Sequence, residues 1–336
     1  MKKIRVAQIG INFFSHGRFI WESMKKQSDI FELVGYALPE NERQRLSDQL
    51  HIFDGYREMT VKEILEDSEI DAVAIETDEI YLTKYALMVA KAGKHIHMEK
   101  PGGRELADFE QLIEAVKKKG TAFHTGYMYR YNPYVIELIE KIKRGELGEI
   151  VSVEAQMNCS HTKEVREWLK DFPGGMLFFL GCHLIDLILR IQGPPEEIIP
   201  LCCSTGADGV TSQDFGMSVL KYKNGVSFAK AHDNQIGGFA RRSLVVTGTK
   251  ATVEISPLEM FAENNLQFTE KTEFTSEDWS DRGVKCSCEP FNRYDGMMAA
   301  FASYVRGEKE NPYTLDYELA LYKTLLKCCG VNVDII

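Results

Sequence analysis

No stretch of this sequence is apolar over the ~20 residues needed to cross a membrane. The first residues, 1–6, lack the long apolar core and the small-residue cleavage site of a secretory signal peptide, and are typical of a strand instead. Lysine and arginine number 40 against 50 aspartates and glutamates, so the net charge is −10 and no basic domain for nucleic acid stands out. These absences predict a cytoplasmic protein that binds small molecules rather than nucleic acid or membranes.

Paired Cys-x-x-Cys spacing, which a structural zinc site would use, is absent from the eight cysteines. A chain of this length without a signal peptide is expected to keep its thiols free. His95 and His97 lie two residues apart on one strand face, where neighbours are more often their partners than a metal. The sequence therefore predicts no metal site.

The first part of the chain alternates short apolar strands with amphipathic helices. Strands are expected at residues 3–9, 32–38, 71–75, 95–98 and 121–125. This alternation predicts a parallel sheet with helices on both faces.

Glycine is scarce in the first strand-turn-helix, where a dinucleotide-binding loop usually carries G-x-G-x-x-G. The three positions are Gly10, Asn12 and Ser15. Asn12 tolerates left-handed backbone and offers an amide to a phosphate, and Ser15 offers a helix cap. Phe13 is bulky for such a loop. A dinucleotide site and a plain strand-turn-helix both remain open for this segment alone.

The acid that usually holds a ribose 2′-OH after the second strand is replaced by Leu38. Glu40 or Asn41 is a substitute, and Arg43 is a candidate for a 2′-phosphate, although acids flank it. The cofactor is therefore NAD or NADP, with a slight preference for NAD.

A short strand ends at Glu99-Lys100-Pro101, because proline has no N–H with which to continue a sheet. Ligands of open α/β sheets bind at the carboxyl ends of strands. Lys100 is therefore either a donor that faces a ligand or an ordinary loop lysine. Thr77, which follows another strand, is a further candidate for contact with a cofactor, as is Glu99.

After residue 126 the pattern changes to strands in succession, expected at 150–157, 218–222, 226–231, 243–246 and 251–255. Such a run predicts an antiparallel sheet with one face on helices and the other forming a site wall or an oligomer interface. Two domains follow, 1–126 and 127–336, with the last helix able to return to the first. The acidic stretch 270–289 is expected to be a solvated excursion.

His183 begins a predicted helix, and Asp186 shares its face one turn later. A histidine near a substrate hydroxyl can take its proton, and a nearby carboxylate raises its basicity. The alternative is a histidine whose partner is a helix cap or a carbonyl. Trp168 is a candidate for stacking on a sugar, with a core tryptophan as the equal alternative.

Together these segments resemble the Gfo/Idh/MocA family of NAD(P)-dependent oxidoreductases over nearly the whole chain. The resemblance lies in the first strand-turn-helix and in segments 92–101, 130–133, 174–175, 181–186 and 247–252. It implies an α/β fold, with an N-terminal Rossmann parallel sheet and a C-terminal α/β domain with a large, mostly antiparallel open sheet that forms dimers or tetramers.

The resemblance also implies roles for individual residues. Lys100 would bond the reacting oxygen of a sugar or polyol, and His183 would exchange its proton, while Arg130 would contact the substrate.

Three departures from the family matter. The usual aspartate four residues before the histidine is Phe179, Leu38 removes the usual ribose partner, and the glycine loop is degenerate, with the bulky Phe13 in it.

The leading hypothesis is an NAD(P)-dependent dehydrogenase or reductase that transfers hydride to or from a carbinol carbon of a sugar, polyol or derivative. Phe179, Leu38 and the degenerate loop leave two alternatives. One is a non-catalytic regulatory protein that binds a nucleotide or sugar. The other is a redox-neutral enzyme that uses bound NAD transiently.

Overall fold

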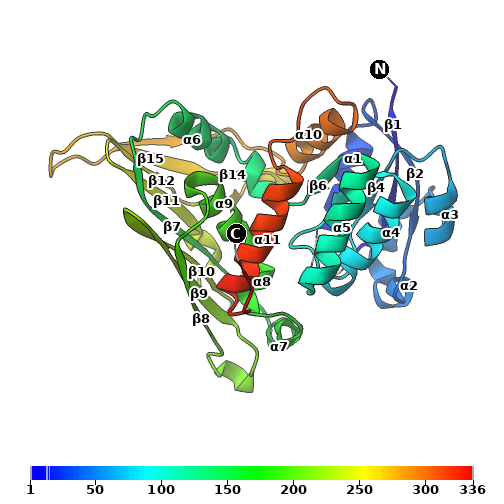
Figure 1. Cartoon of the computed structure of the whole chain (residues 1–336), viewed down its shortest axis with the longest axis horizontal. Helices are drawn as coiled ribbons and strands as arrows, with labels where there is room; N and C mark the ends of the chain where they lie inside the picture. The colour runs from blue at the N-terminus through cyan, green and yellow to red at the C-terminus, as the bar shows by residue number, and fades with distance from the viewer. Residues whose placement is uncertain (1, 13, 15, 335–336) are drawn as a thin grey trace. The chain divides into compact units, whose positions relative to one another are not determined.

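The computed structural model describes residues 2–12, 14 and 16–334. They divide into two compact units, which are described in turn (Figure 1). Unit 1 comprises Met1–Tyr127 and Tyr294–Leu319, and unit 2 comprises Met128–Arg293 and Ala320–Ile336.

The centre of unit 1 is a six-stranded sheet in the order β3-β2-β1-β4-β5-β6, with every neighbouring pair parallel. Its strands are β1 (Ile4–Ile9), β2 (Phe31–Ala37), β3 (Arg57–Glu58), β4 (Ala72–Ile75), β5 (His95–Met98) and β6 (Phe123–Thr125). The inner strands are almost wholly buried, as expected where helices cover both faces. The predicted Rossmann-like parallel sheet is confirmed, and its expected strands are correct to within two residues.

Helices connect these strands. They are α1 (Gly17–Lys26), α2 (Glu42–Arg45), α3 (Val61–Glu66), α4 (Leu82–Ala92), α5 (Leu106–Lys119) and, from the later part of the chain, α10 (Asp295–Val305). Helices α4 and α5 pack side by side, and α1 packs against α10 (Figure 1). The apolar stripe of α1, including Ile20, Trp21 and Met24, is fully buried. The helices thus fix where the loops after β1, β4 and β5 lie.

Unit 2 is built on an eight-stranded sheet in the order β16-β15-β12-β11-β7-β10-β9-β8. Its strands are β7 (Ile150–Asn158), β8 (Glu197–Cys203), β9 (Phe215–Tyr222), β10 (Gly225–His232), β11 (Ser243–Gly248), β12 (Thr252–Ile255), β15 (Glu270–Phe274) and β16 (Val284–Ser287). A separate small hairpin joins β13 (Met260–Phe261) to β14 (Gln267–Phe268). Among the eight strands, β7 and β10 form the one parallel pair, and the other neighbours are antiparallel. The predicted large, mostly antiparallel sheet is confirmed.

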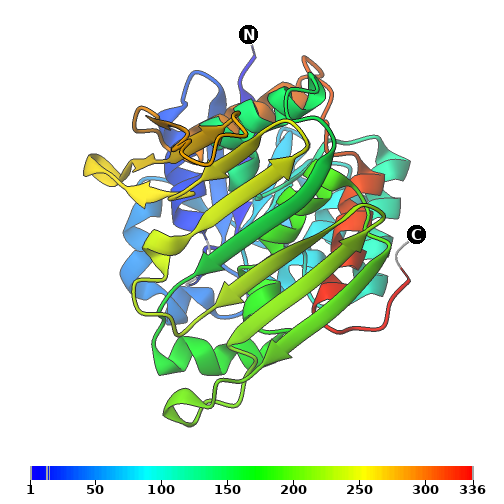
Figure 2. The ribbon, with the colours of Figure 1, turned by 90° about the vertical axis from the view of Figure 1, so that its left-hand side faces the viewer.

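Helices cover one face of this sheet. They include α6 (Pro133–Lys143), α7 (Lys163–Trp168), α8 (Met176–Phe179), α9 (Cys182–Gln192) and the end of α11 (Leu315–Cys328). Helix α9 contacts β7 and β10, and α8 contacts β9 and β10. The opposite face, which is turned to the viewer in Figure 2, carries no helix of the described part of unit 2 across its central strands.

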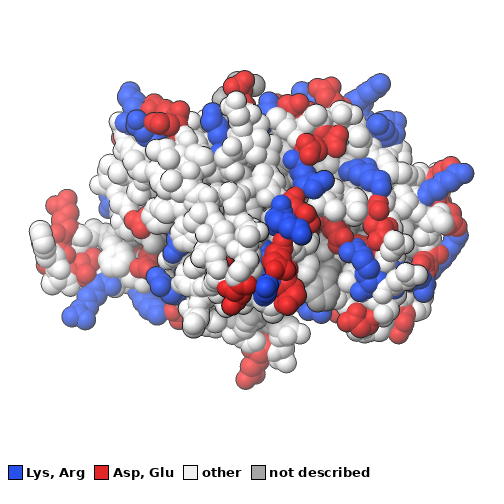
Figure 3. Space-filling model, turned by 90° about the horizontal axis from the view of Figure 1, so that it is seen from below, with Lys and Arg blue, Asp and Glu red and all other residues white. Residues whose placement is uncertain are grey.

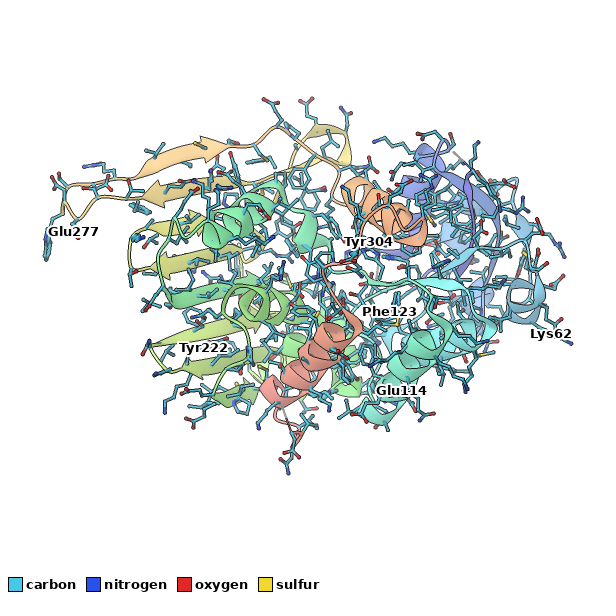
Figure 4. The ribbon with its side chains drawn as sticks, turned by 45° about the horizontal axis from the view of Figure 1, so that its top comes forward. Lys62, Glu114, Phe123, Tyr222, Glu277 and Tyr304 are labelled. Atoms are coloured by element: carbon cyan, nitrogen blue, oxygen red, sulfur yellow. The ribbon has the colours of Figure 1, made fainter. Side chains whose placement is uncertain are left out.

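The segment 270–289 is mostly exposed, as expected of a solvated excursion, but it is not irregular, because it forms the hairpin β15–β16 at the edge of the sheet. Its loop extends to Glu277 (Figure 4). Ion pairs across and along the strands replace an apolar alternation here, since Lys271 bonds Glu137 and Glu273, and Lys285 bonds Glu270. A strand held by charged pairs lacks the period-two apolar pattern by which a strand is recognised.

The eight cysteines are all free, as expected. The longest helices within residues 2–334, α5 and α11, have 14 residues each, and none that is described could cross a membrane. Acidic and basic side chains are interspersed over the face seen in Figure 3.

Candidate active site

The loop after β1 approaches the loop after β4 closely at Gly10. Gly10 has φ +86°, and a Cβ at this position would lie 2.6 Å from the backbone nitrogen of Thr77. Only glycine fits this left-handed, crowded position without strain. Gly10 therefore has the close backbone approach expected of the first glycine of a dinucleotide-binding loop.

Asn12 adopts the left-handed backbone expected of it, with φ +39°. Its amide Nδ2 donates to Thr77 O at 3.3 Å and to Glu79 Oε2 at 3.0 Å, and its Oδ1 accepts from Phe14 N at 3.0 Å. The side chain thus ties the loop to the end of β4, and a phosphate would have to share this amide. Phe13 and Ser15 lie outside the described residues.

The segment after β2 places two acids near this loop. Leu38 is half-buried and offers no polar atom. Glu40 accepts from Lys84 Nζ at 2.6 Å and from Tyr85 OH at 2.7 Å, and these bonds hold its pKa below the usual value. Glu42 accepts a hydrogen bond from Ile11 N at 3.2 Å, so one N–H group of the loop after β1 is already bonded to a carboxyl group.

Lys100 follows β5 and is buried, with 2% of its side chain exposed. Its Nζ lies 3.6 Å from Glu99 Oε1, which is also buried. Burial alone would raise the pKa of Glu99, but hydrogen bonding from His16 and the charge of Lys100 lower it below the usual value. The ordinary loop-lysine interpretation is therefore wrong for Lys100, because a solvated lysine would not be buried against a carboxylate.

Three further carboxyl groups of this edge have raised pKa values. Burial and the charge of Glu99 raise the pKa of Glu76 well above its usual value. Burial raises the pKa of Glu79 to about 7 although Lys100 opposes it, and burial with the charge of Asp78 raises that of Glu42 to about 8. Raised pKa values lower the negative charge of this edge near neutral pH, which favours an anionic ligand there.

His95 and His97 each have a neighbouring polar group as partner. His95 Nδ1 accepts from Ala122 N at 2.9 Å, while His97 Nδ1 lies 2.8 Å from His124 Nδ1. These contacts support the interpretation in which neighbours are the partners of the two histidines.

In unit 2, His183 lies in the first turn of α9 and is 1% exposed. The ring of Tyr129 meets its imidazole edge-on, with centroids 5.0 Å apart. The Tyr129 hydroxyl donates to Glu259, which is also bonded by Arg242 and Arg293 at 2.5 Å each. A buried aromatic and ionic network therefore holds one side of the imidazole.

Glu259 remains ionised in this network. Burial would raise its pKa, but the charges of Arg293 and Arg242 lower it to about 2. Burial and the Glu259 charge raise the pKa of Tyr129 far above its usual value, so its hydroxyl remains a donor.

Asp186, expected beside His183, forms a buried two-point ion pair with Arg130 instead. The distances are 2.9 Å from Arg130 Nε to Oδ2 and 2.7 Å from Nη2 to Oδ1. This pair joins α9 to the short helix η3 (Met128–Tyr131). It supports a role for Arg130 in positioning the segment that carries Tyr129 and leaves its predicted substrate contact as a prediction.

Trp168 and Phe179 lie together, with ring centroids 5.1 Å apart and planes at 87°. Trp168 is half-buried and also meets Phe172 edge-on at 4.8 Å. The departure at position 179 thus extends an aromatic cluster one turn before His183.

Sequence reasoning missed Glu42, Glu79, Tyr129, Arg242 and Glu259. Their partners lie 17 to 130 residues away along the chain, so no local pattern indicated them. Tyr129 alone had a signal, because it belongs to the aromatic-rich segment before Pro133.

Comparison with known proteins gives matches in both halves of the chain. Residues 4–127 match an oxidoreductase family with an NAD-binding Rossmann fold, and residues 135–254 match the GFO/IDH/MocA C-terminal domain. Among curated relatives, 1,5-anhydro-D-fructose reductase of Ensifer adhaerens is 23% identical over 74% of this chain and 73% of its own length. Myo-inositol 2-dehydrogenase of Thermotoga maritima is 22% identical over 91% of this chain and 88% of its own length.

A solved structure of levoglucosan dehydrogenase in complex with NADH and levoglucosan has the same fold, with a TM-score of 0.78 and 17% identity over 98% of each chain. The two family matches together span more than half of the sequence. The chain therefore belongs to the GFO/IDH/MocA family of oxidoreductases and carries its NAD-binding Rossmann domain.

Proposed function

We propose that this enzyme is an NAD(P)-dependent dehydrogenase or reductase that acts on one carbinol carbon of a sugar, polyol or derivative. Residues 1–126 bind the cofactor through Gly10 and Asn12 after β1 and through Thr77 after β4. Residues 127–336 bind the substrate. The observation that carries the proposal is the buried Lys100 at the carboxyl end of β5, paired with Glu99.

The bound nicotinamide supplies or accepts the hydride. Lys100 donates a hydrogen bond to the substrate oxygen, whose negative charge grows as the C–H bond breaks. His183 takes the hydroxyl proton in oxidation and returns it in reduction. Tyr129, held by Glu259, keeps the imidazole oriented, and Trp168 offers an aromatic face for the sugar.

Charge placement supports NAD rather than NADP. A 2′-phosphate needs an available cation near the end of β2. Arg43 is bonded to Glu58 and Arg45 to Asp78, while Glu40 remains ionised close by. Glu40 is therefore the group that accepts from the ribose hydroxyls.

Replacement of Lys100 tests the proposal. The Lys100→Met variant is expected to lower kcat/KM by about 10²–10⁴-fold, because the donor to the developing oxyanion is lost, while cofactor affinity changes little. The substrates to be assayed are myo-inositol, 1,5-anhydro-D-fructose and levoglucosan, which the names of the relatives provide. Cofactor binding is followed by nicotinamide fluorescence.

Lys94 provides a matched control, because it is a buried lysine just before β5 that donates to Asp67 O and Ile70 O. Lys94→Met should lower stability and leave kcat near the wild-type value. A fully active Lys100→Met enzyme would contradict the proposal. If the wild-type protein binds the cofactor but turns over none of the substrates, a non-catalytic binding protein is favoured. If it turns over a substrate while it retains the cofactor and shows no net redox change, a redox-neutral reaction is favoured.

A further inference from the structure

Cys159, His161 and Asp233 form a compact cluster in unit 2 at the ends of β7 and β10. Their donor atoms all lie within 4.8 Å of one another. Cys159 and Asp233 are buried, and His161 is half-buried. The cluster was invisible in the sequence because Cys159 and Asp233 lie 74 residues apart.

The parallel pairing of β7 and β10 creates this cluster. Asn158 is opposite His232, so the two strands end level and Cys159 and Asp233 come directly after them. The segments beyond the strands are then joined by backbone bonds from Cys159 N to His232 O, His161 N to Asp233 O and Gln235 N to Cys159 O, of 2.9–3.2 Å. The three side chains are therefore fixed by sheet structure, not by a mobile surface loop.

The geometry is close to that of a metal-binding site. Cys159 Sγ lies 3.5 Å from His161 Nδ1 and 3.1 Å from Asp233 Oδ1. Bond lengths to zinc of about 2.0–2.3 Å place the atoms of a tetrahedral site about 3.4–3.6 Å apart. The distance from the Cys159 thiol to the His161 imidazole already matches this spacing. The distance between His161 Nδ1 and Asp233 Oδ1 is 2.5 Å, so these two atoms would have to separate by about 1 Å.

Asp233 provides an independent sign that a ligand is missing. It is fully buried, and its Oδ2 accepts no hydrogen bond from any residue the structure describes. A buried carboxylate oxygen without a donor is costly, and a cation would satisfy it. Arg242, which neighbours Cys159, is already bonded to Glu259, Tyr129 and Asn158 O.

We propose that Cys159, His161 and Asp233 bind a divalent transition-metal ion of the Zn²⁺ type, with water or a small ligand in the fourth position. Thiolate, imidazole and carboxylate are the donor types that zinc takes in proteins. The thiol proton leaves to solvent when Cys159 binds the ion, and His161 provides a route of entry because it is half-exposed. Neither Lys100 nor His183 belongs to this cluster, and none of its three residues has a role in the proposed redox reaction.

The other interpretation of the cluster is a hydrogen-bonded triad in which the Cys159 thiol and His161 both donate to Asp233. Metal binding distinguishes the two. The protein is stripped with a chelator, dialysed, and titrated with Zn²⁺ in competition with a chromophoric chelator, and with Co²⁺ in the spectrometer. We expect one equivalent to bind, with a thiolate-to-cobalt charge-transfer band for a tetrahedral site.

Single replacements identify the ligands. Cys159→Ser should abolish the charge-transfer band and weaken Zn²⁺ binding at least about 100-fold, and His161→Gln should weaken it at least about tenfold. Cys203→Ser removes an exposed thiol of β8 and should change neither. Asp233→Asn is checked for folding by circular dichroism, and His161→Gln remains informative if Asp233→Asn does not fold.

The proposal is overturned if the stripped protein binds no Zn²⁺ more tightly than about micromolar, or if Cys159→Ser and Cys203→Ser bind alike. Equal binding by those two variants would mean adventitious metal on surface groups. The cluster would then be the hydrogen-bonded triad.

Discussion

Glu42 is a buried carboxyl group that bonds the Gly10–Asn12 loop, and its pKa of about 8 makes cofactor binding depend on pH. It is neutral at pH 6 and ionises as the pH rises toward 9. The new charge then repels the pyrophosphate, and its hydrogen bond competes for Ile11 N–H. Glu79, with a pKa of about 7, acts in the same direction.

We therefore expect the Kd for NADH to rise about tenfold between pH 6.5 and 9, which corresponds to ~1.4 kcal/mol. Glu42→Gln should flatten this profile, because the amide keeps an acceptor for Ile11 N–H but cannot ionise. Glu40→Gln is the control, since Glu40 is already ionised throughout, and its replacement should shift affinity without changing the slope. The Kd for NADH of the wild type and both variants is measured by titration of nicotinamide fluorescence at several pH values.

The same pKa shift makes a prediction about stability without cofactor. The folded-state pKa of Glu42, about 8, lies above the ordinary 4.5 of the unfolded chain. The folded protein then binds more protons between these values, so stability falls as the pH rises from about 4.5 to about 8. Thermal unfolding of wild type should show this fall, and Glu42→Gln should show a smaller one. An identical fall in both proteins would contradict the assigned role of Glu42.

At the scale of elements, the Arg130–Asp186 pair joins η3 to α9 and so positions Tyr129 and His183 on adjacent elements. Asp186→Asn would remove the buried carboxylate charge that holds the Arg130 guanidinium at two points, and we expect it to lower the free energy of unfolding by about 3–5 kcal/mol. Glu140→Gln, which removes an exposed partner of Lys143, should change the free energy of unfolding far less, because solvent screens that pair. The free energy of unfolding of both variants is measured by chemical denaturation. Equally small losses in the two variants would mean that the Arg130–Asp186 pair does not stabilise the fold.

Element types were predictable where apolar periodicity determined them. The alternation around β1, α4 and β5 predicted the parallel sheet. At the start of α3, Thr60 and Glu63 form a capping box, and their Thr-x-x-Glu spacing is the local pattern typical of one. Periodicity failed at β15 and β16, where ion pairs stabilise the hairpin.

Part of the site was predictable for a related reason. Lys100 stood out because Pro101 ends its strand locally, and His183 stood out through its helix. The partners of Asn12 and Tyr129 were not predictable, because Glu79 and Glu259 reach them only through tertiary structure. Asp186 shares a helix face with His183, yet its bonds run to Arg130, 56 residues away. Spacing identifies which residues share a face, but it does not identify their partners.

At the scale of the whole molecule, the face of the eight-stranded sheet that is turned to the viewer in Figure 2 is open. Apolar residues lie opposite one another on its strands β8, β9 and β10. Between β8 and β9, Leu201 is opposite Met217 and Ile199 is opposite Val219. Val219 is also opposite Phe228 of the next strand, β10. Leu201 and Ile199 are 51% and 43% exposed. A contiguous apolar patch of this kind marks an interaction surface.

We expect this face to join copies of the chain into a dimer or tetramer, since a two-fold interface pairs the same patch with itself and buries all these side chains at once. Leu201→Glu should weaken self-association by at least about tenfold, because each interface would then bury two carboxylates without partners. Ile136→Glu is the control, since Ile136 is similarly exposed (47%) but lies on α6, a helix of unit 2 that packs on β12. Sedimentation velocity over a concentration series should shift only the Leu201→Glu protein toward the monomer. A wild-type monomer at all concentrations, or an equal shift in both variants, would exclude this face as the interface.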